Sequence, residues 1–428
     1  MISKSTAVQF PITDFRIIKN KVLNWSKRFN TFCFLDNHQY QIPPHSQECL
    51  LAAGVKSSLN LAGNNTLQQL ADYTSQNKGK WLFGHINYDL KNELEKLQRS
   101  RPDHIGFPLV FFFEPEILVR LSEKELTIEA DEPDRVFEEI KNTNESISGH
   151  PARLSIKNRL TREQYIEIIG KLQEHILRGD CYEINFCQEF YAEHSSIDPC
   201  QVYRKLSEIS PNPFSAFYRV EDKWLLCASP ERFLKKDGNR IFAQPIKGTS
   251  GRVNSDSVLD ERSRSELYHS AKDRSENVMI VDLMRNDLSK VCEEGSVVVD
   301  ELYGIYSFPQ VHQMISTISG ELSPQTNFSE IIKACFPMGS MTGAPKKRVM
   351  ELIDQYETTA RGIFSGTLGY ISPSGDFDFN VIIRSIMYNA TDHYLSFLTG
   401  SGITYYSDPQ KEWEECMLKA EAMNQCFT

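Results

Sequence analysis

A lysine between an apolar flank and two small residues is the side chain in this sequence best suited to act as a nucleophile. Lys247 lies in the segment Gln244–Thr249 (QPIKGT), where Gly248 follows it directly. A tight, partly dry setting lowers the pKa of a lysine, and the free amine then serves as a nucleophile or a base. The alternative is a surface lysine in a turn.

A second group with possible acid–base chemistry is Glu231, in the segment Ser229–Phe233 (SPERF). The apolar run Trp224–Ala228 before it is typical of a strand. Glu231 would then stand at a strand end, where a carboxyl group can act as a general acid. The alternative is an ion pair between Glu231 and Arg232 or another cation.

Two pairs of carboxylates recur at a spacing of three residues. Asp273 and Glu276 share one face of a predicted helix, and Glu412 and Glu415 share a face of another. Four carboxylates on two helices could converge on a hard divalent cation. Mg²⁺ takes one or two carboxylates and leaves its other positions to water and substrate oxygens. The alternative is two solvated charged faces.

Three further features could bind an anion. The small-residue loop Gly339–Lys346 (GSMTGAPK) leads into a predicted helix, whose free amides and dipole favour negative charge. Gly400–Gly402 (GSG) offers further exposed amides, and Arg384 lies inside an apolar, strand-like run where it needs a carboxylate. A plain helix cap, a tight turn and a buried protein ion pair are the respective alternatives. Together with the amine and the acidic pairs, these features indicate a small polycarboxylate substrate.

The composition excludes several classes of protein. The chain has 428 residues, of which 40% are hydrophobic and 24% charged, as in an ordinary globular protein. The formal net charge of −10 argues against a nucleic-acid partner. No run approaches the ~20 apolar residues of a membrane helix, and no export signal is seen. The ten cysteines form no Cys-x-x-Cys pair, so we expect reduced thiols in a cytoplasmic protein without membrane partners.

The order of predicted elements favours an α+β fold over a regular βαβ alternation. P-loop, simple dinucleotide, zincin and α/β-hydrolase motifs are absent. The Asn-, Ser-, Gly- and Pro-rich segment Lys141–Pro151 is the candidate domain boundary. The patterns predict strands near 32–35, 107–113, 117–119 and 181–191, and helices near 87–97, 161–179 and 261–287, from 345, and from 408 to 425.

Four segments resemble the chorismate-utilising enzymes, a family that holds anthranilate synthase component I, aminodeoxychorismate synthase component I, isochorismate synthase and salicylate synthase. The resemblance runs from about Leu160 to the end of the sequence, and Trp81–Asn92 resembles an N-terminal stretch of the family. It implies an anthranilate synthase component I-like fold, with large mixed or antiparallel sheets and helices packed outside. It also implies an N-terminal subdomain of that type in residues 1–145 and a chorismate-binding catalytic domain in residues 146–428. The four segments are 229–233 (SPERF), 245–249 (PIKGT), 272–287 (KDRSEN through DLMRND) and 343–346 (GAPK).

The resemblance also implies roles for individual residues. Mg²⁺ would lie between Glu276 and Glu415 and hold the ring carboxylate of chorismate, with Asp273 and Glu412 in support. The enolpyruvyl side would be held by Arg384, Tyr370, Gly400, Ser401 and Gly402. The ring pocket would be lined by Gly248, Thr249, Gly339 and Ser340.

Within the family, Lys247 is the mark of the aminodeoxychorismate synthases, because anthranilate synthases have Pro-Ile-Ala-Gly-Thr at this motif. The implied chemistry is covalent. The Lys247 amine attacks ring C2 while the C4 hydroxyl leaves with help from Glu231, and ammonia then adds at C4 as the lysine departs. The resemblance thus implies a transferase that makes 4-amino-4-deoxychorismate for 4-aminobenzoate and folate, with ammonia from a glutamine amidotransferase subunit. Anthranilate synthase component I and a non-catalytic family member are the alternatives.

Two positions depart from the pattern of the family. Glu183 stands where close relatives often have Gln, and where isochorismate and salicylate synthases have a lysine base that adds water at C2. Gln313 occupies the slot of the catalytic His, with His312 one place early. The Leu-Leu-Glu-Ser signature of tryptophan-sensing relatives is also absent, so we expect no feedback inhibition by tryptophan.

Overall fold

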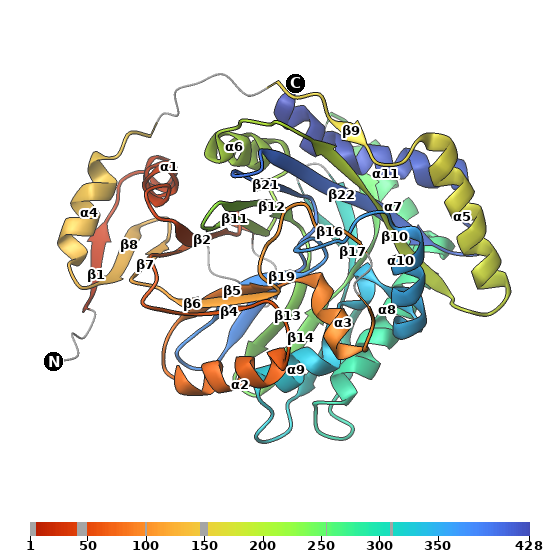
Figure 1. Cartoon of the computed structure of the whole chain (residues 1–428), viewed down its shortest axis with the longest axis horizontal. Helices are drawn as coiled ribbons and strands as arrows, with labels where there is room; N and C mark the ends of the chain where they lie inside the picture. Colours follow the sequence, from red (N-terminus) through yellow and green to blue (C-terminus); the bar gives the residue numbers. More distant parts are fainter. Residues whose placement is uncertain (1–5, 41–48, 99–100, 146–152, 254, 309–310) are drawn as a thin grey trace.

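Two large sheets lie at the centre of the molecule, and helices cover their outer faces (Figure 1). A computed structural model describes residues 6–40, 49–98, 101–145, 153–253, 255–308 and 311–428. Within these ranges every pairing of neighbouring strands is antiparallel. The expected α+β fold with helices packed outside the sheets is confirmed.

The strands follow one another in space in an order that differs from their order in the chain. In the first sheet the order is β1 (Thr6–Pro11), β8 (Glu125–Ala130), β7 (Ile117–Leu121), β3 (Cys49–Ala53), β2 (Thr31–Asp36), β11 (Phe214–Val220), β12 (Lys223–Ser229), β21 (Ser385–Asn389), β22 (Tyr394–Ile403), β10 (Glu183–Ala192) and β18 (Gly343–Ala344), with β9 (Lys157–Asn158) also on β10. In the second sheet it is β15 (Ile246–Gly251), β17 (Val311–Glu321), β14 (Arg240–Gln244), β13 (Arg232–Asp237), β20 (Phe377–Asn380), β19 (Thr367–Ile371), β5 (Leu82–Ile86), β6 (Val110–Glu114) and β4 (Ser57–Leu61), with β16 (Val298–Ser307) also on β17.

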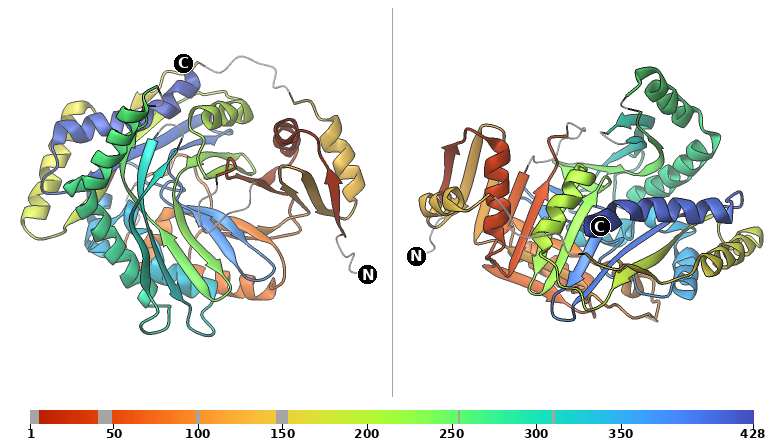
Figure 2. Two further views of the ribbon diagram at one scale, coloured as in Figure 1. Left: turned by 180° about the vertical axis from the view of Figure 1, so that it is seen from behind. Right: turned by 90° about the horizontal axis from the view of Figure 1, so that it is seen from above.

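The helices gather at the two ends and over the outer faces of the sheets. Figure 2 shows α1 and α4 at one end of the molecule, away from α5, α8 and α11. None of the helices among the described residues is both long enough and apolar enough to cross a bilayer. The helices are α1 (Phe15–Ser26), α2 (Thr66–Gln76), α3 (Lys91–Leu94), α4 (Pro133–Asn142), α5 (Arg162–Leu177), α6 (Pro199–Ile209), α7 (Ser257–His269), α8 (Ala271–Ser289), α9 (Phe328–Cys335), α10 (Lys346–Tyr356) and α11 (Pro409–Asn424), with 3₁₀ turns η1 (Tyr88–Leu90), η2 (Gly339–Met341) and η3 (Gln425–Phe427).

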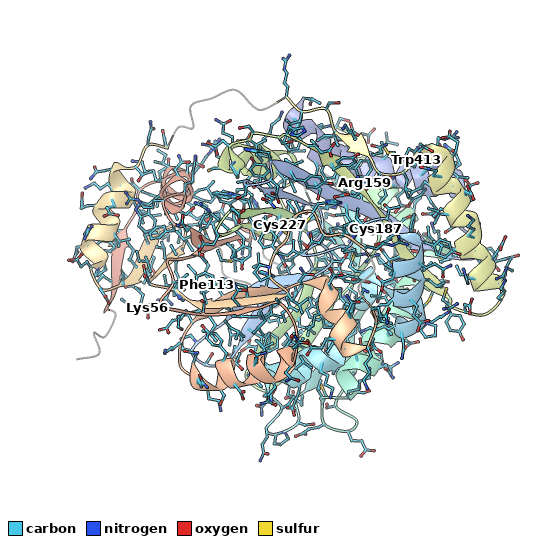
Figure 3. The ribbon with its side chains drawn as sticks, viewed as in Figure 1. Lys56, Phe113, Arg159, Cys187, Cys227 and Trp413 are labelled. Atoms are coloured by element: carbon cyan, nitrogen blue, oxygen red, sulfur yellow. The ribbon has the colours of Figure 1, made fainter. Side chains whose placement is uncertain are left out.

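Alternate residues of the first sheet pack into two different hydrophobic cores, because successive side chains of a strand face opposite sides. In β2, Cys33 enters the core shared with the second sheet, and Phe32 and Phe34 enter the core under the helices. Both faces of this strand are therefore buried, which explains its continuous apolar sequence. All ten cysteines are buried free thiols, as expected, and Figure 3 shows Cys187 and Cys227 in the interior.

Ser270 divides the single helix that the sequence predicts for 261–287 into α7 and α8. Its ψ of 111° is extended, and its side chain accepts a hydrogen bond from the backbone N–H of Asp273. Serine competes with the helical backbone in this way, so the prediction of one continuous helix was wrong here. The helix predicted near 87–97 is reduced to η1 and α3, whereas the predicted caps at Thr161 and Asp408 are confirmed.

Both sheets join strands from the two predicted domains. Phe34 of β2 lies opposite Phe217 of β11, and Gly84 of β5 lies opposite Gly369 of β19. Most of the candidate boundary falls in 146–152, outside the described residues. The division into residues 1–145 and 146–428 stays a prediction, and the shared sheets show that the two parts are not separated in space.

A buried ion pair ties the start of β10 to η2. The Arg361 guanidinium, 3% exposed as a residue, donates hydrogen bonds to Glu357 (2.6 Å) and to the backbone carbonyls of Asn185 (2.8 Å) and Met341 (2.6 Å). Glu357 also accepts a hydrogen bond from the backbone N–H of Cys187 (2.9 Å). The pair therefore fixes two segments that carry candidate site residues.

Replacement of Arg361 by Met should lower the free energy of unfolding by about 3–5 kcal/mol, because the Glu357 carboxylate would stay buried without its charge partner. Urea unfolding followed by tryptophan fluorescence measures the change. Arg262→Ala is the control, since the Arg262–Glu266 pair on α7 is 73% and 64% exposed, and it should cost less than about 1 kcal/mol. Equal losses in the two variants would contradict this account of the buried pair.

Candidate active site

Lys247 meets Glu183 where the two sheets come together. Lys247 is the second residue of β15 in the second sheet, and Glu183 is the first residue of β10 in the first sheet. The Nζ of Lys247 lies 2.5 Å from Oε1 of Glu183, and the two side chains are only 10% and 1% exposed. This burial excludes the alternative of a surface lysine in a turn.

Lys247 is protonated in this structure, whereas a dry setting alone would give a neutral amine. Burial lowers the pKa of Lys247, but the negative charges of Glu183 and Glu276 and the hydrogen bond to Glu183 outweigh burial, so the pKa lies above its ordinary value. The resting lysine is therefore an ammonium ion held by a carboxylate.

Glycines make room for this pair. A Cβ atom at Gly402 of β22 would lie 2.5 Å from Oε1 of Glu183 and 2.9 Å from Nζ of Lys247, closer than packed atoms can approach. Gly248 has a φ of +93°, and a Cβ there would lie 3.0 Å from the Cβ of Asp273. The glycines predicted to line the site thus let β22 and α8 approach the Lys247–Glu183 pair.

Glu231 lies beside the pair, between β12 and β13, with only 4% of the residue exposed. Burial raises the pKa of its carboxyl group to about 7, and a hydrogen bond with Ser340 and the Lys247 charge offset part of this effect. Arg232 pairs with Asp378 instead (2.8 Å), so the alternative ion pair between Glu231 and Arg232 does not form. A carboxyl group that exchanges its proton near neutral pH, close to an amine, meets the requirement for a general acid.

The four predicted carboxylates surround one cation, Lys272. Its Nζ lies 3.8 Å from Oε1 of Glu276 on α8 and 3.8 Å from Oε1 of Glu412 on α11. Burial lowers the pKa of Lys272, but Glu276, Glu412, Glu415 and Asp273 together raise it above the ordinary value. The two acidic pairs therefore converge, and the alternative of two separate solvated faces is excluded.

The acidic cluster also fits a divalent cation. The buried Oε1 of Glu276 accepts no hydrogen bond from any described residue, and burial raises the pKa of this carboxyl group to about 7. Lys272 is 54% exposed and can move away. Among the described residues, no three Asp, Glu, His or Cys side chains enclose a metal ion by themselves. Mg²⁺ typically takes one or two carboxylates and completes its shell with water and substrate oxygens, and the magnesium site stays a prediction.

Glu415 is paired with a lysine of its own helix, Lys419. Although burial opposes ionisation, Lys419 lies 2.7 Å away and lowers the pKa of the Glu415 carboxyl group. Lys419 also donates a hydrogen bond to the carbonyl of Gly400 (2.9 Å). Glu412 accepts a hydrogen bond from the hydroxyl of Ser401 (2.5 Å). The acidic face of α11 is thus attached to the glycine-rich end of β22.

Arg384 is a half-buried cation without an acidic partner among the described residues. It lies between β20 and β21 with a φ of +49°, not inside a strand as the sequence suggests. Burial lowers the pKa of its guanidinium group with no acid opposing the shift, and no carboxylate of the described residues forms an ion pair with it. Because Met387 of β21 lies opposite Ser396 of β22, Arg384 stands at the strand end near Gly400. Such a guanidinium is suited to a carboxylate of a substrate.

The segment Gly400–Gly402 is part of β22, not a turn. Gly402 lies opposite Asn185 of β10, so one edge of the segment is paired. On the other side, β21 pairs only with Tyr394–Ser396. The amides on that side of the segment are therefore not used by β21.

Unpaired polar atoms gather at this site, although buried polar groups in folded proteins are rarely without a partner. Ser340 of η2 is 5% exposed, and its side chain lies next to Glu231, whose pKa it lowers by a hydrogen bond. Its neighbour Gly339 packs on Leu283 of α8. Oε1 of Gln313, which lies opposite the exposed Thr249, has no described partner. With Oε2 of Glu183 and Oε1 of Glu276, this atom indicates a site built for a polar ligand.

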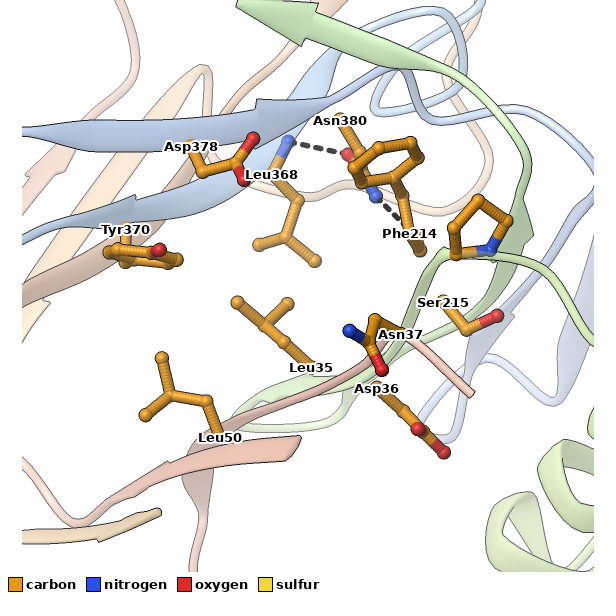
Figure 4. A pocket seen from close by; sticks show the side chains of 11 residues that line it. Leu35, Asp36, Asn37, Leu50, Phe214, Ser215, Leu368, Tyr370, Asp378 and Asn380 are labelled. Atoms are coloured by element: carbon orange, nitrogen blue, oxygen red, sulfur yellow. Dashed lines mark hydrogen bonds between the residues drawn. The ribbon is translucent and has the colours of Figure 1, made fainter. Parts of the chain in front are cut away.

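The structure gives no contact between Tyr370 and the other predicted site residues, so its role on the enolpyruvyl side stays a prediction. In the second sheet its strand, β19, is separated from β15 by β17, β14, β13 and β20. Tyr370 lines instead a cavity of about 40 Å³ between the sheets, beside Leu35 and Asp378 (Figure 4). It packs on Trp81 with ring centroids 5.5 Å apart. Motif order gives the strand of Tyr370 but not the position of that strand in the sheet.

Lys272 and Glu183 are the two residues of the site to which the sequence assigns no role. Lys272 precedes Glu276 by four residues on a helix, and residues at this spacing share one face. This spacing could have predicted that Lys272 lies beside Glu276 at the site. Glu183 lies 64 residues from Lys247, and no local pattern predicts a contact between strands of two sheets.

Comparison with known proteins gives a family for the whole arrangement. The family model described as chorismate binding enzyme matches residues 25–425. Aminodeoxychorismate synthase component 1 of Escherichia coli is 42% identical over 259 residues, which cover 60% of this chain and 56% of that protein. An anthranilate synthase component I-like protein of Synechocystis is 34% identical over 354 residues, 81% of this chain and 72% of that protein. The chain thus matches little more than half the length of the relatives named aminodeoxychorismate synthase component 1.

The solved structures agree in fold. Anthranilate synthase component I from Streptococcus pneumoniae superposes with a TM-score of 0.79 at 24% identity, over 90% of this chain and 93% of that one. The menaquinone-specific isochorismate synthase of Escherichia coli superposes with a TM-score of 0.76 at 15% identity, over 99% and 94%. The fold is therefore of the anthranilate synthase component I type. With a family model that spans almost its whole length, the chain belongs to the chorismate binding enzymes.

Proposed function

We propose that this protein is component I of an aminodeoxychorismate synthase, which converts chorismate and ammonia to 4-amino-4-deoxychorismate. The observation that carries the proposal is the buried Lys247 amine, 2.5 Å from Glu183 and beside the Glu231 carboxyl group. An amine in this position can form a covalent bond to a ring carbon. The relatives named aminodeoxychorismate synthase component 1 support the same activity.

In the proposed reaction the Lys247 amine attacks ring C2 of chorismate, both ring double bonds shift by way of C1, C6 and C5, and the bond from C4 to the hydroxyl group breaks. Glu231 has a pKa of about 7, so its acid form is available at neutral pH. It gives its proton to the departing hydroxyl, which leaves as water. Ammonia then forms a bond to C4 and the lysine leaves C2. Two successive displacements place the nitrogen at C4, whereas direct attack of ammonia at C2 would place it next to the ring carboxylate.

The two carboxylates of chorismate would be held at opposite sides of this amine. Arg384 offers a guanidinium without an acidic partner to one of them. Glu276 and Glu415, supported by Asp273 and Glu412, would hold Mg²⁺ for the other, and Mg²⁺ supplies positive charge that neutralises the ring carboxylate. Gly248, Thr249, Gly339 and Ser340 would line the ring, and Gly400, Ser401 and Gly402 the enolpyruvyl side.

Ammonia would come from a glutamine amidotransferase subunit, and a separate lyase would convert the product to 4-aminobenzoate for folate. The name "component 1" of the relatives is in keeping with a second component. Ten free, buried thiols suit the reducing cytoplasm, where we place the protein. The net charge of −10 gives no support to a nucleic-acid partner.

Anthranilate synthase component I is the second candidate, because one relative carries the name anthranilate synthase component I-like protein. That reaction needs no nucleophilic side chain under C2. The buried Lys247 therefore favours the aminodeoxychorismate synthase. A non-catalytic family member is disfavoured by the converging carboxylates and by the unpaired atoms of the site.

Replacement of Lys247 by Ala should lower the rate of 4-amination by at least about a thousandfold, because the covalent route loses its nucleophile. The rate is measured with chorismate, Mg²⁺ and ammonium in the presence of an excess of the lyase that yields 4-aminobenzoate. Lys236→Ala is the matched control, since Lys236 of β13 pairs with Asp376 (3.2 Å) outside the site and its loss should leave the rate unchanged. Unchanged 4-amination in Lys247→Ala would refute the covalent route.

The pH profile should report Glu231. Since burial raises the pKa of its carboxyl group to about 7 and the acid form is the active one, kcat/KM should fall as pH rises above about 7. In Glu231→Gln this alkaline limb should disappear while kcat/KM drops by about 10²–10⁴-fold. An alkaline limb that persists in the variant would assign it to another group.

Replacement of Glu276 by Gln should abolish Mg²⁺-dependent binding of chorismate together with activity, because the unpaired Oε1 carboxylate oxygen is lost. Isothermal titration calorimetry with and without Mg²⁺ measures the binding. Glu414→Gln on the exposed side of α11, next to Glu415, serves as the control. If Glu276→Gln kept Mg²⁺-dependent binding, the metal would lie elsewhere. If the unaltered protein showed none, the non-catalytic alternative would be favoured.

A further inference from the structure

The carboxylate that faces Lys247 has no structural partner among the described residues other than this lysine. Oε1 of Glu183 accepts the hydrogen bond of Lys247, and Oε2 is buried without a hydrogen-bond partner. A carboxylate kept for structure is usually bonded through both oxygens, as in the pair of Glu357 with Arg361 and Cys187. Glu183 is 1% exposed, so leaving one oxygen unpaired costs stability. This cost points to a role in chemistry.

A proton must leave Lys247 before its amine can attack, since an ammonium ion has no free electron pair. Four acidic groups on four elements face this lysine: Glu183 of β10, Glu276 of α8, Glu231 before β13 and Glu415 of α11. Only Glu183 is in hydrogen-bond contact with the amine. Glu231 must hold its own proton to act as the acid, and Glu276 and Glu415 are assigned to a cation. Glu183 is therefore the acceptor that the geometry offers.

We propose that Glu183 is the base that takes the proton from Lys247 and later returns it, a role that rests on the proposed function. The ammonium of Lys247 gives one proton to Oε1 of Glu183, which leaves a neutral amine beside a neutral carboxylic acid. The amine then forms its bond to C2. When the bond from C2 to the lysine breaks, the released amine takes the proton back from Glu183. The ammonium group formed at C4 by attack of ammonia gives its surplus proton to the ionised Glu231, so both carboxyl groups end as they began.

Burial makes this transfer accessible. In a site of low dielectric, the ammonium and the carboxylate lose their solvation by water. The free energy of the neutral pair, amine and carboxylic acid, is therefore closer to that of the charged pair than it would be in water. The donor and acceptor atoms are 2.5 Å apart, which leaves the proton a short path.

The pH dependence of adduct formation tests this role. Enzyme in excess over chorismate, with Mg²⁺ and without ammonia, is quenched with acid at intervals, and mass spectrometry of the Lys247 peptide gives the single-turnover rate. Between pH of about 5.5 and 7, where Glu231 is protonated, the rate in the unaltered enzyme should change by less than about twofold, since the proton stays inside the site. In Glu183→Gln the proton must leave to solvent, so the rate should fall about tenfold for each pH unit lowered.

Two further variants separate the base from the shape of the site. Glu183→Asp keeps a carboxylate and should keep the flat profile at a reduced rate. Glu189→Gln removes the carboxylate that holds Arg159 (2.7 Å) farther along the same strand, and it should also keep the flat profile. Parallel profiles for Glu183→Gln and the unaltered enzyme would overturn the role of Glu183 alone. If the rate of adduct formation in the unaltered enzyme fell tenfold for each pH unit lowered, the role of Glu183 would be overturned even if Glu183→Gln did not fold. The absence of any adduct in the unaltered enzyme would overturn the proposed function and this role with it.

Discussion

A lysine ammonium enclosed with a carboxylate, almost out of reach of water, is the constraint on which the site depends. The Lys247–Glu183 pair draws one residue from each sheet, so the pair exists only when both sheets are formed and correctly placed. A buried ion pair of this kind adds little stability compared with an apolar contact of the same size. Its presence at the centre of the site is better explained by what the amine can do than by what the pair contributes to folding.

The fold around the pair serves to bring charges together at close range. Gly402 and Gly248 remove the side chains that would keep β22 and α8 away from the pair. The Arg361–Glu357 pair holds η2 against β10 and so fixes the backbone on which Ser340 stands. The acidic cluster around Lys272 lies near the amine through Glu276, and Arg384 stands at the strand end near Gly400. A small dianion could be held there by a cation at one end and a guanidinium at the other.

The sequence was informative where chemistry and local spacing coincide. The spacing of i and i+3 predicted that each pair of carboxylates shares one helix face, while the meeting of the two helices, like the role of Lys247, followed from the resemblance to the family. Local pattern could not predict the contact of Lys247 with Glu183, because strand pairing in these sheets is non-local. The same limit applies to Tyr370, whose strand was recognisable but whose place in the sheet was not. Ser270 shows a third limit, since one side chain that caps a helix can divide a run whose apolar pattern looks continuous.

The raised pKa of Lys247 changes how the amine must be understood. Dry surroundings alone predict a free amine at rest, but the structure holds an ammonium ion whose proton has a defined neighbour. Activation then depends on the movement of one proton over a short distance rather than on desolvation of the lysine.

The central claim is that this buried amine directs nitrogen to C4 of chorismate. The most direct measurement is the nuclear magnetic resonance spectrum of the product formed by the purified chain from chorismate, Mg²⁺ and ¹⁵N-ammonium. The account predicts ¹⁵N bonded to C4, in 4-amino-4-deoxychorismate that keeps its enolpyruvyl group. Nitrogen at C2, with anthranilate and pyruvate as the products, would contradict it.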